Sequence, residues 1–473
     1  MTDVVDAAEQ QQVTPSMLAQ LRAALARLRA FFAQTEIDLR LFGMLVALIA
    51  ILLGFNIYSG GTFFRPVNMV TLAIQGTSVA IIATGMVLII VSRNIDLSVG
   101  SIVGFVAMSY ALLMTDWLPA IGLGSDFPFR WAVALAIGLG IGAAFGAVQG
   151  FLVAYIGVPS FVVTLGGLLS IRGATWYLSR GAAVSGLDPT FQRLNGSAQG
   201  SIGGTLTWVV AAVGCIAVAW LFASGRRQRL RYGFPVRPMW AEIMLGVIAS
   251  AAIVWLAWFA NASYWPKNLA AQYAQEHGIT PPPGGLLISS GFPFPLMLLV
   301  AVALVMTWLA TRRQFGRYVY AYGGNPEAAE LAGINTRWTI MKTFILIGTL
   351  SALSAAVVAA RLNGATLDLG VSYELFVIAA AVVGGTSFAG GIGTIPGAVL
   401  GAFVMASLSY GLSYIGVNSP GQNVVAGIVL ILAVTFDTYT RAAAAADRRR
   451  PMMTAPTTNG GVPLVELMDI RVS

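Results

Sequence analysis

The run Leu41–Tyr58, LFGMLVALIAILLGFNIY, holds no charged side chain and is long enough for a helix that crosses a lipid bilayer. Similar runs recur through the chain, whose 473 residues are 57% hydrophobic and 10% charged. Soluble domains carry about 25% charged residues. Because hydrocarbon offers no water to backbone groups, repeated runs of this length predict an all-α fold, a polytopic bundle of transmembrane helices.

The apolar runs predict about twelve crossings, or ten if two of them are re-entrant. The glycine-rich stretch Gly384–Gly391 between two apolar runs predicts broken or re-entrant helices. The expected segments are Leu41–Tyr58, Asn68–Val91, Gly104–Met114, Trp131–Tyr155, Pro159–Gly173, Leu206–Ala223, Met239–Ala260, Phe292–Thr311, Thr343–Ala360, Leu375–Val383, Pro396–Tyr410 and Gln422–Phe436.

One of these segments carries a glycine at every fourth position. Such spacing places Gly138, Gly142, Gly146 and Gly150 on one face of a helix. A smooth strip of this kind is typical of transmembrane helices that pack closely against a neighbour.

Three regions follow from the composition. Residues 1–40 form a polar tail whose arginines and leucines fit either an amphipathic helix on the membrane surface or a solvated helix. Residues 41–438 form the transmembrane domain, which includes a span and loop at about 225–291. Residues 439–473 are expected to be a disordered tail.

The formal charge of +8 comes mainly from arginines in loops and tails. The basic clusters Arg22–Arg40, Arg226–Arg237, Arg312–Arg317 and Arg441–Arg450 fall on one membrane face of the predicted topology. The positive-inside rule therefore places both termini in the cytoplasm. A nucleic-acid-binding protein would gather its arginines on one folded face, so this function is not expected.

Two further chemistries are not expected from the sequence. The single cysteine, Cys215, permits no intrachain disulfide, and the single histidine, His277, permits no multi-histidine metal site. A phosphate-binding loop needs Gly-Lys followed by Ser or Thr, whereas Lys267 and Lys342 follow proline and methionine. We expect no catalytic residue, no metal and no cofactor in this chain, so any ATP would be hydrolysed by a separate subunit.

A short polar stretch, Tyr320–Asn335 or YAYGGNPEAAELAGIN, separates two long apolar runs inside the loop 312–340. Gly323 and Gly324 are expected to loosen the backbone before a helix that Asn325 caps and Pro326 begins. Gly333 is expected to close this helix as a left-handed cap. About two turns cannot span a bilayer, so the helix is expected outside it, either as a docking element or as an ordinary helical loop.

The stretch NPEAAELAGIN resembles the cytoplasmic coupling motif of the ABC importer permeases for monosaccharides. Similarity to that family extends from about Leu41 to Thr438 and is greatest with the xylose-type members; NIDLSVG, PSFVVTLGGLLSIRG and GGTSFAGGIGTIPGA also resemble family segments. The resemblance implies a homodimer in the bacterial inner membrane, with a separate ATPase, a periplasmic sugar-binding protein and a monosaccharide, xylose or a similar pentose, as substrate. The residues it implies for coupling are Gly324, Asn325, Pro326, Glu327, Ala328, Ala329, Leu331, Gly333 and Ile334.

A translocation path for a polyol is expected to use neutral hydrogen-bonding side chains. Asp96, within NIDLSVG, is expected either to cap the following helix or to line this path, since acids near a bilayer are costly. The candidates for the path are Gln75, Thr77, Asn94, Asp96, Ser98, Gln149 and Thr164.

Three alternatives remain open from the sequence. A branched-chain amino acid permease has a similar docking loop. An ion-coupled secondary sugar transporter is disfavoured because the expected spans hold almost no charge. A membrane scaffold that transports nothing is the third.

Overall fold

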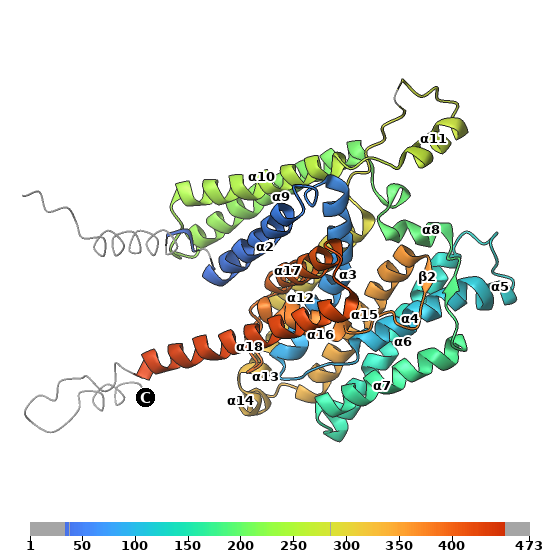
Figure 1. Cartoon of the computed structure of the whole chain (residues 1–473). Helices are drawn as coiled ribbons and strands as arrows, with labels where there is room; N and C mark the ends of the chain where they lie inside the picture. The colour runs from blue at the N-terminus through green and yellow to red at the C-terminus, as the bar shows by residue number, and fades with distance from the viewer. Residues whose placement is uncertain (1–33, 37, 284, 450–473) are drawn as a thin grey trace, which may run out of the picture.

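The computed structural model describes residues 34–36, 38–283 and 285–449 and is almost entirely helical (Figure 1). The long helices are α2 (Leu39–Tyr58), α3 (Pro66–Val91), α4 (Val99–Leu112), α6 (Arg130–Phe151), α7 (Ser160–Ser179), α9 (Gly204–Arg231), α10 (Met239–Asn261), α12 (Phe294–Arg312), α15 (Thr336–Leu362), α17 (Ile395–Tyr414) and α18 (Ser419–Arg449).

Shorter elements join these helices. The short α-helices are α5 (Leu118–Ala120), α8 (Pro189–Gln192), α11 (Lys267–Glu276), α13 (Gln314–Gly324), α14 (Pro326–Leu331) and α16 (Tyr373–Val383). The π-helical turns are η1 (Leu113–Trp117) and η2 (Leu152–Ile156), and the 3-10 turns are η3 (Arg193–Asn195) and η4 (Ala198–Gly200). Strands β1 (Val184–Ser185) and β2 (Gly364–Ala365) pair antiparallel.

Ten helices of the described chain are long and apolar enough to cross a membrane, and two shorter apolar helices, α16 and the 419–432 part of α18, accompany them. This confirms the predicted polytopic bundle. The span expected over Gly104–Met114 is longer in the structure, Val99–Ala120, because the turn η1 continues the helix. The expected segment Leu375–Val383 lies in α16, an 11-residue helix that is too short to cross a bilayer.

The core lies where α3, α4 and α15 meet. In the most apolar 18-residue stretch of α3, 94% of the residues are buried. In the corresponding stretches of α9 and α10, only 11% are buried. The two helices α9 and α10 pack against each other and stand at one side of the bundle (Figure 1). Helix α10 and, in the loop after it, helix α11 lie within the range 225–291.

The glycine strip of α6 brings this helix into close contact with α15. A Cβ atom on Gly142 would collide with the carbonyl oxygen of Gly348, and one on Gly146 with the carbonyl oxygen of Phe344. Gly138 leaves room for the ring of Tyr110. The prediction of close packing along the strip is confirmed, and α15 is its partner.

The two ends of the chain were expected to be tails outside the transmembrane domain. Helix α18 continues through 439–449, so this part of the range expected to be disordered is helical. The alanine run 442–446 explains the extension, because alanine is the strongest helix former. Residues 450–473 and the predicted amphipathic helix in 1–33 lie outside the described residues.

Two glycines of α6 provide a test of this packing. Gly146→Ala should lower stability by about 1–3 kcal/mol, because the added methyl group meets backbone that cannot rotate away. Gly140→Ala on the same helix is the control, since a Cβ there meets nothing within 4 Å. Thermal unfolding of the detergent-solubilised variants measures the difference, and equal melting temperatures would contradict it.

Candidate functional site

Helix α14 is a short, well-capped helix between α13 and α15. Asn325 caps its N-terminus, its Oδ1 accepting from the backbone N–H of Ala328 at 3.1 Å, and Pro326 is the first helical residue. At the other end Gly333 has φ +76°, its N–H donates to the Glu330 carbonyl, and that of Ile334 donates to the Ala329 carbonyl. These two bonds form a Schellman motif. The helix is therefore fixed in direction at both ends.

The predicted coupling residues form one largely exposed surface on α14. Leu331 is 90% exposed, whereas Ala329 is only 4% exposed and anchors the opposite face. Pro326 and Ile334 are half-buried. The exposed members are Gly324, Asn325, Glu327, Ala328, Leu331 and Gly333. A leucine that projects into water from a helix outside the apolar spans is suited to burial by a partner.

Arg93 ties the α13–α14 segment to the end of α3. Its Nε donates to the carbonyl of Gly323 at 2.8 Å, and its Nη2 donates to the carbonyl of Gly324 at 2.9 Å. Both carbonyls belong to the last turn of α13, where a helix leaves its acceptors unsatisfied. A cation at a helix C-terminus is also favoured by the helix dipole.

A loop between α16 and α17 completes the junction. The N–H of Gly391 donates to the carbonyl of Val91 at 3.0 Å, and the hydroxyl of Tyr320 donates to the carbonyl of Gly393 at 2.7 Å. A Cβ on Gly323 would collide with the Val91 carbonyl oxygen. Gly323 was expected to loosen the backbone, and this expectation is wrong: it lies in α13 and permits close approach of two chain segments.

A buried polar cluster follows Arg93 along the chain. Asp96 is fully buried, and its Oδ1 accepts from the backbone N–H of Ser98 at 2.8 Å and from the Ser98 hydroxyl at 2.7 Å. The amide of Gln149, from α6, contacts the Ser98 hydroxyl at 2.8 Å. Among the described residues, Asp96 Oδ2 has no hydrogen-bond partner. Asp96 thus caps the turn before α4 rather than the amides of its first turn.

The other path candidates do not all join this cluster. The Thr164 hydroxyl lies 3.3 Å from the carbonyl of Ile95 and so borders the cluster. Asn94 bonds to Ser92, and Thr77 bonds to Ala73 within its own helix. Gln75 is half-buried on α3. Three of the seven candidates, Asp96, Ser98 and Gln149, are therefore in direct contact.

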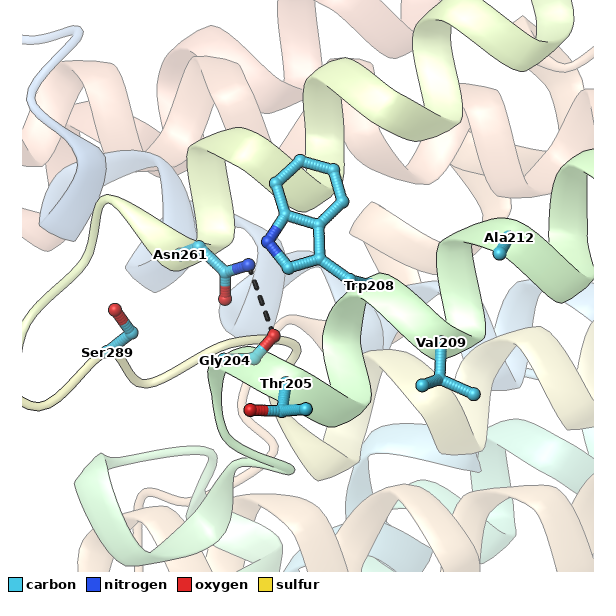
Figure 2. Close-up of a pocket in the computed structure, with 7 residues that line it drawn as sticks. All are labelled: Gly204, Thr205, Trp208, Val209, Ala212, Asn261 and Ser289. Carbon is cyan, nitrogen blue, oxygen red and sulfur yellow. Dashed lines mark hydrogen bonds between the residues drawn. The ribbon is translucent and has the colours of Figure 1, made fainter.

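The principal described cavities lie elsewhere, along α9 and α10. One of about 620 Å³ opens between the start of α9 and the end of α10, where Asn261 Nδ2 donates to the Gly204 carbonyl at 3.3 Å beside Trp208 (Figure 2). Within the described part of the chain, no three His, Cys, Asp or Glu side chains gather into a metal site.

Comparison with known proteins connects this architecture to one family. Residues 68–434 match the family described as branched-chain amino acid transport system / permease component. The chain belongs to this permease family. The xylose transport system permease protein XylH of Escherichia coli K12 is 34% identical over 423 residues, which cover 89% of this chain and 98% of XylH.

Two other relatives of the permease are also named for sugars. The galactose/methyl galactoside import permease protein MglC of E. coli K12 is 28% identical over 84% of the permease and 93% of MglC. The ribose import permease protein RbsC of the same strain is 31% identical over 79% of the permease and 87% of RbsC. No solved structure matches the chain. The relatives confirm the resemblance to sugar permeases and identify a multi-pass transport component rather than an enzyme.

Sequence reasoning missed the residues that join α13 and α14 of the permease to its core. No role was assigned from the sequence to Arg93, whose acceptor Gly323 lies 230 residues further along the chain. One signal was available: an arginine directly after a long apolar run, next to a family-like segment. Its partner could not be found without the fold.

Removal of the Arg93 side-chain bonds should loosen α13. Arg93→Met deletes two charge-assisted hydrogen bonds, so local opening should become easier by roughly 1–2 kcal/mol, a low value because the side chain is exposed. Hydrogen exchange of the amides of α13 should accelerate about 5- to 30-fold. Arg337→Met, at an exposed arginine beside α14, serves as the control; unchanged exchange in Arg93→Met would refute the link.

Proposed function

We propose that the chain is the permease subunit of a binding-protein-dependent, ATP-driven importer for a monosaccharide, xylose or a similar pentose. The observation that carries the proposal is α14, an exposed capped helix fixed to the core by Arg93, in a chain without a Gly-Lys-Ser/Thr phosphate loop. The sugar-named relatives support the substrate class.

The docking helix transmits motion of a separate ATPase to the bundle. Its two caps make α14 a rigid body, and Leu331 with Glu327 forms the contact face. Displacement of α14 moves the C-terminal turn of α13, which Arg93 connects to the end of α3. Three residues after Arg93, Asp96 accepts hydrogen bonds from Ser98, and the Ser98 hydroxyl in turn contacts the Gln149 amide. ATPase closure thereby shifts the population between inward-open and outward-open arrangements.

The transport path is lined by neutral polar groups. Hydroxyl and amide side chains such as Ser98 and Gln149 offer both donors and acceptors, which suits a polyol better than a charged solute. Selectivity resides chiefly in a periplasmic sugar-binding protein, so the path needs only modest affinity. Two copies of the chain enclose the path. The arginine clusters support a cytoplasmic position for both termini and α14 in a bacterial inner-membrane protein.

Reconstitution separates this proposal from its alternatives. In proteoliposomes with the cognate ATPase and binding protein, labelled xylose should accumulate only when ATP is supplied. Accumulation of leucine instead would identify a branched-chain amino acid permease, as the family description allows. Uptake driven by an ion gradient without the ATPase would identify a secondary transporter, and the absence of uptake and of ATPase binding would indicate a scaffold.

Charge reversal on the docking helix should uncouple transport. Glu327→Lys places a cation in the first turn of α14, where the helix dipole and the partner surface favour an acid. Uptake should be abolished while the protein remains inserted in the membrane. Glu276→Lys, at the end of α11, is the matched control; wild-type uptake by Glu327→Lys would contradict the docking role.

Truncation of Leu331 tests the apolar part of the same contact. Leu331→Ser should leave the melting temperature unchanged, because the side chain is already 90% exposed. Its affinity for the ATPase should fall at least about tenfold, as expected for a central apolar contact. Leu362→Ser, 50% exposed at the far end of α15, is the control. Equal co-purification of the ATPase with both variants would exclude Leu331 from the interface.

A further inference from the structure

The α9–α10 hairpin carries a continuous cleft that changes character along its length. An apolar groove of about 620 Å³ runs between the two helices, and a basic cleft of about 380 Å³ continues it toward their connecting loop. Phe222 and Glu242 line both parts. The two cavities therefore form one site, apolar at one end and charged at the other.

Arginines dominate the charged end. Arg226, Arg229 and Arg237 line the basic cleft, and Arg227 and Arg231 project from the same end of α9. Two acids oppose these five arginines: Glu242 pairs with Arg226 at 2.8 Å, and Glu36 pairs with Arg229 and Arg237. Five positive and two negative charges leave an excess of three positive charges. Arg227 and Arg231 have no ion-pair partner within the described chain.

Glu36 shows that the cleft can hold an oxyanion. Its two carboxylate oxygens accept from Arg229 at 3.0 and 2.9 Å, and one of them also accepts from Arg237 at 3.0 Å. The hydrogen bond from Arg229, aided by Arg237, holds the pKa of Glu36 below its usual value. Two guanidinium groups that converge on one carboxylate offer the same geometry to a phosphate.

The apolar end has room and faces the membrane. A Cβ on Gly246 would meet only Phe222 Cδ2, at 3.8 Å, so the groove is open at this point. Both helices have a mean hydropathy of 2.2 in their most apolar windows, with 11% of those residues buried. Near the arginines, Tyr232 and Phe234 are 63% and 64% exposed, as is typical of side chains at a membrane–water interface.

We propose that this cleft binds an anionic phospholipid, with its phosphate on Arg229 and Arg237 and one acyl chain in the groove beside Gly246. The excess positive charge selects the anionic headgroup, and the adjoining apolar groove distinguishes a lipid from a soluble phosphate. Glu36 occupies part of the headgroup position, so lipid and carboxylate compete for the same two arginines.

Lipid binding by the full-length permease tests the proposal, with phosphatidylglycerol and phosphatidylcholine as the probes and native mass spectrometry as the readout. The wild type should retain phosphatidylglycerol preferentially. Arg229→Gln should weaken that binding about fivefold, the usual effect of one basic residue near a membrane surface. Glu36→Gln should strengthen it, because the competing carboxylate is lost. Gly246→Leu should also weaken it by filling the groove, which tests the site without altering charge.

Arg312→Gln, at an exposed arginine that ends α12, is the matched control and should bind like the wild type. Equal retention of the two lipids would overturn the proposal. So would weaker binding in Glu36→Gln, because the cluster would then be a purely structural network. Displacement of phosphatidylglycerol by inorganic phosphate alone, or burial of the groove against a second copy of the chain, would likewise refute a lipid site.

Discussion

The absence of water in the membrane interior is the constraint on which this structure depends. Every backbone group within the hydrocarbon needs a partner in the protein, so the spans are helical and their interruptions are covered by other helices. The 11-residue α16 and the loop that follows it meet this requirement because α3 and α17 pack against them. The carbonyl of Val91 accepts from Gly391 at this point, which satisfies the end of α3 without solvent.

Small residues allow the helices to come close enough for such bonds to form. Gly142 and Gly146 bring the backbones of α6 and α15 into contact, and Gly323 does the same for α13 and the end of α3. Close packing of backbones gives the bundle a few defined arrangements rather than a continuous range, which suits a transporter that alternates between two states. The buried Asp96–Ser98–Gln149 cluster lies beside this packed region.

The sequence predicted those elements of the permease that are determined by residues close together in the chain. Apolar runs located the spans, and Asn325, Pro326 and Gly333 located both ends of α14. Contacts between distant segments were not accessible in this way. Gly323 was assigned a local role although its neighbours are Val91 and Gly391, and Arg93 could not be matched with α13. At 439–449 the charged surroundings concealed the strong helix propensity of five alanines.

The exposure of Leu331 has a consequence for the life of the protein in the cell. In the proposed assembly the separate ATPase covers this apolar side chain, which is 90% exposed in the chain alone. A copy synthesised in excess of its nucleotide-hydrolysing companion displays that leucine to chaperones and proteases. The proposed assembly therefore favours balanced production of the two gene products.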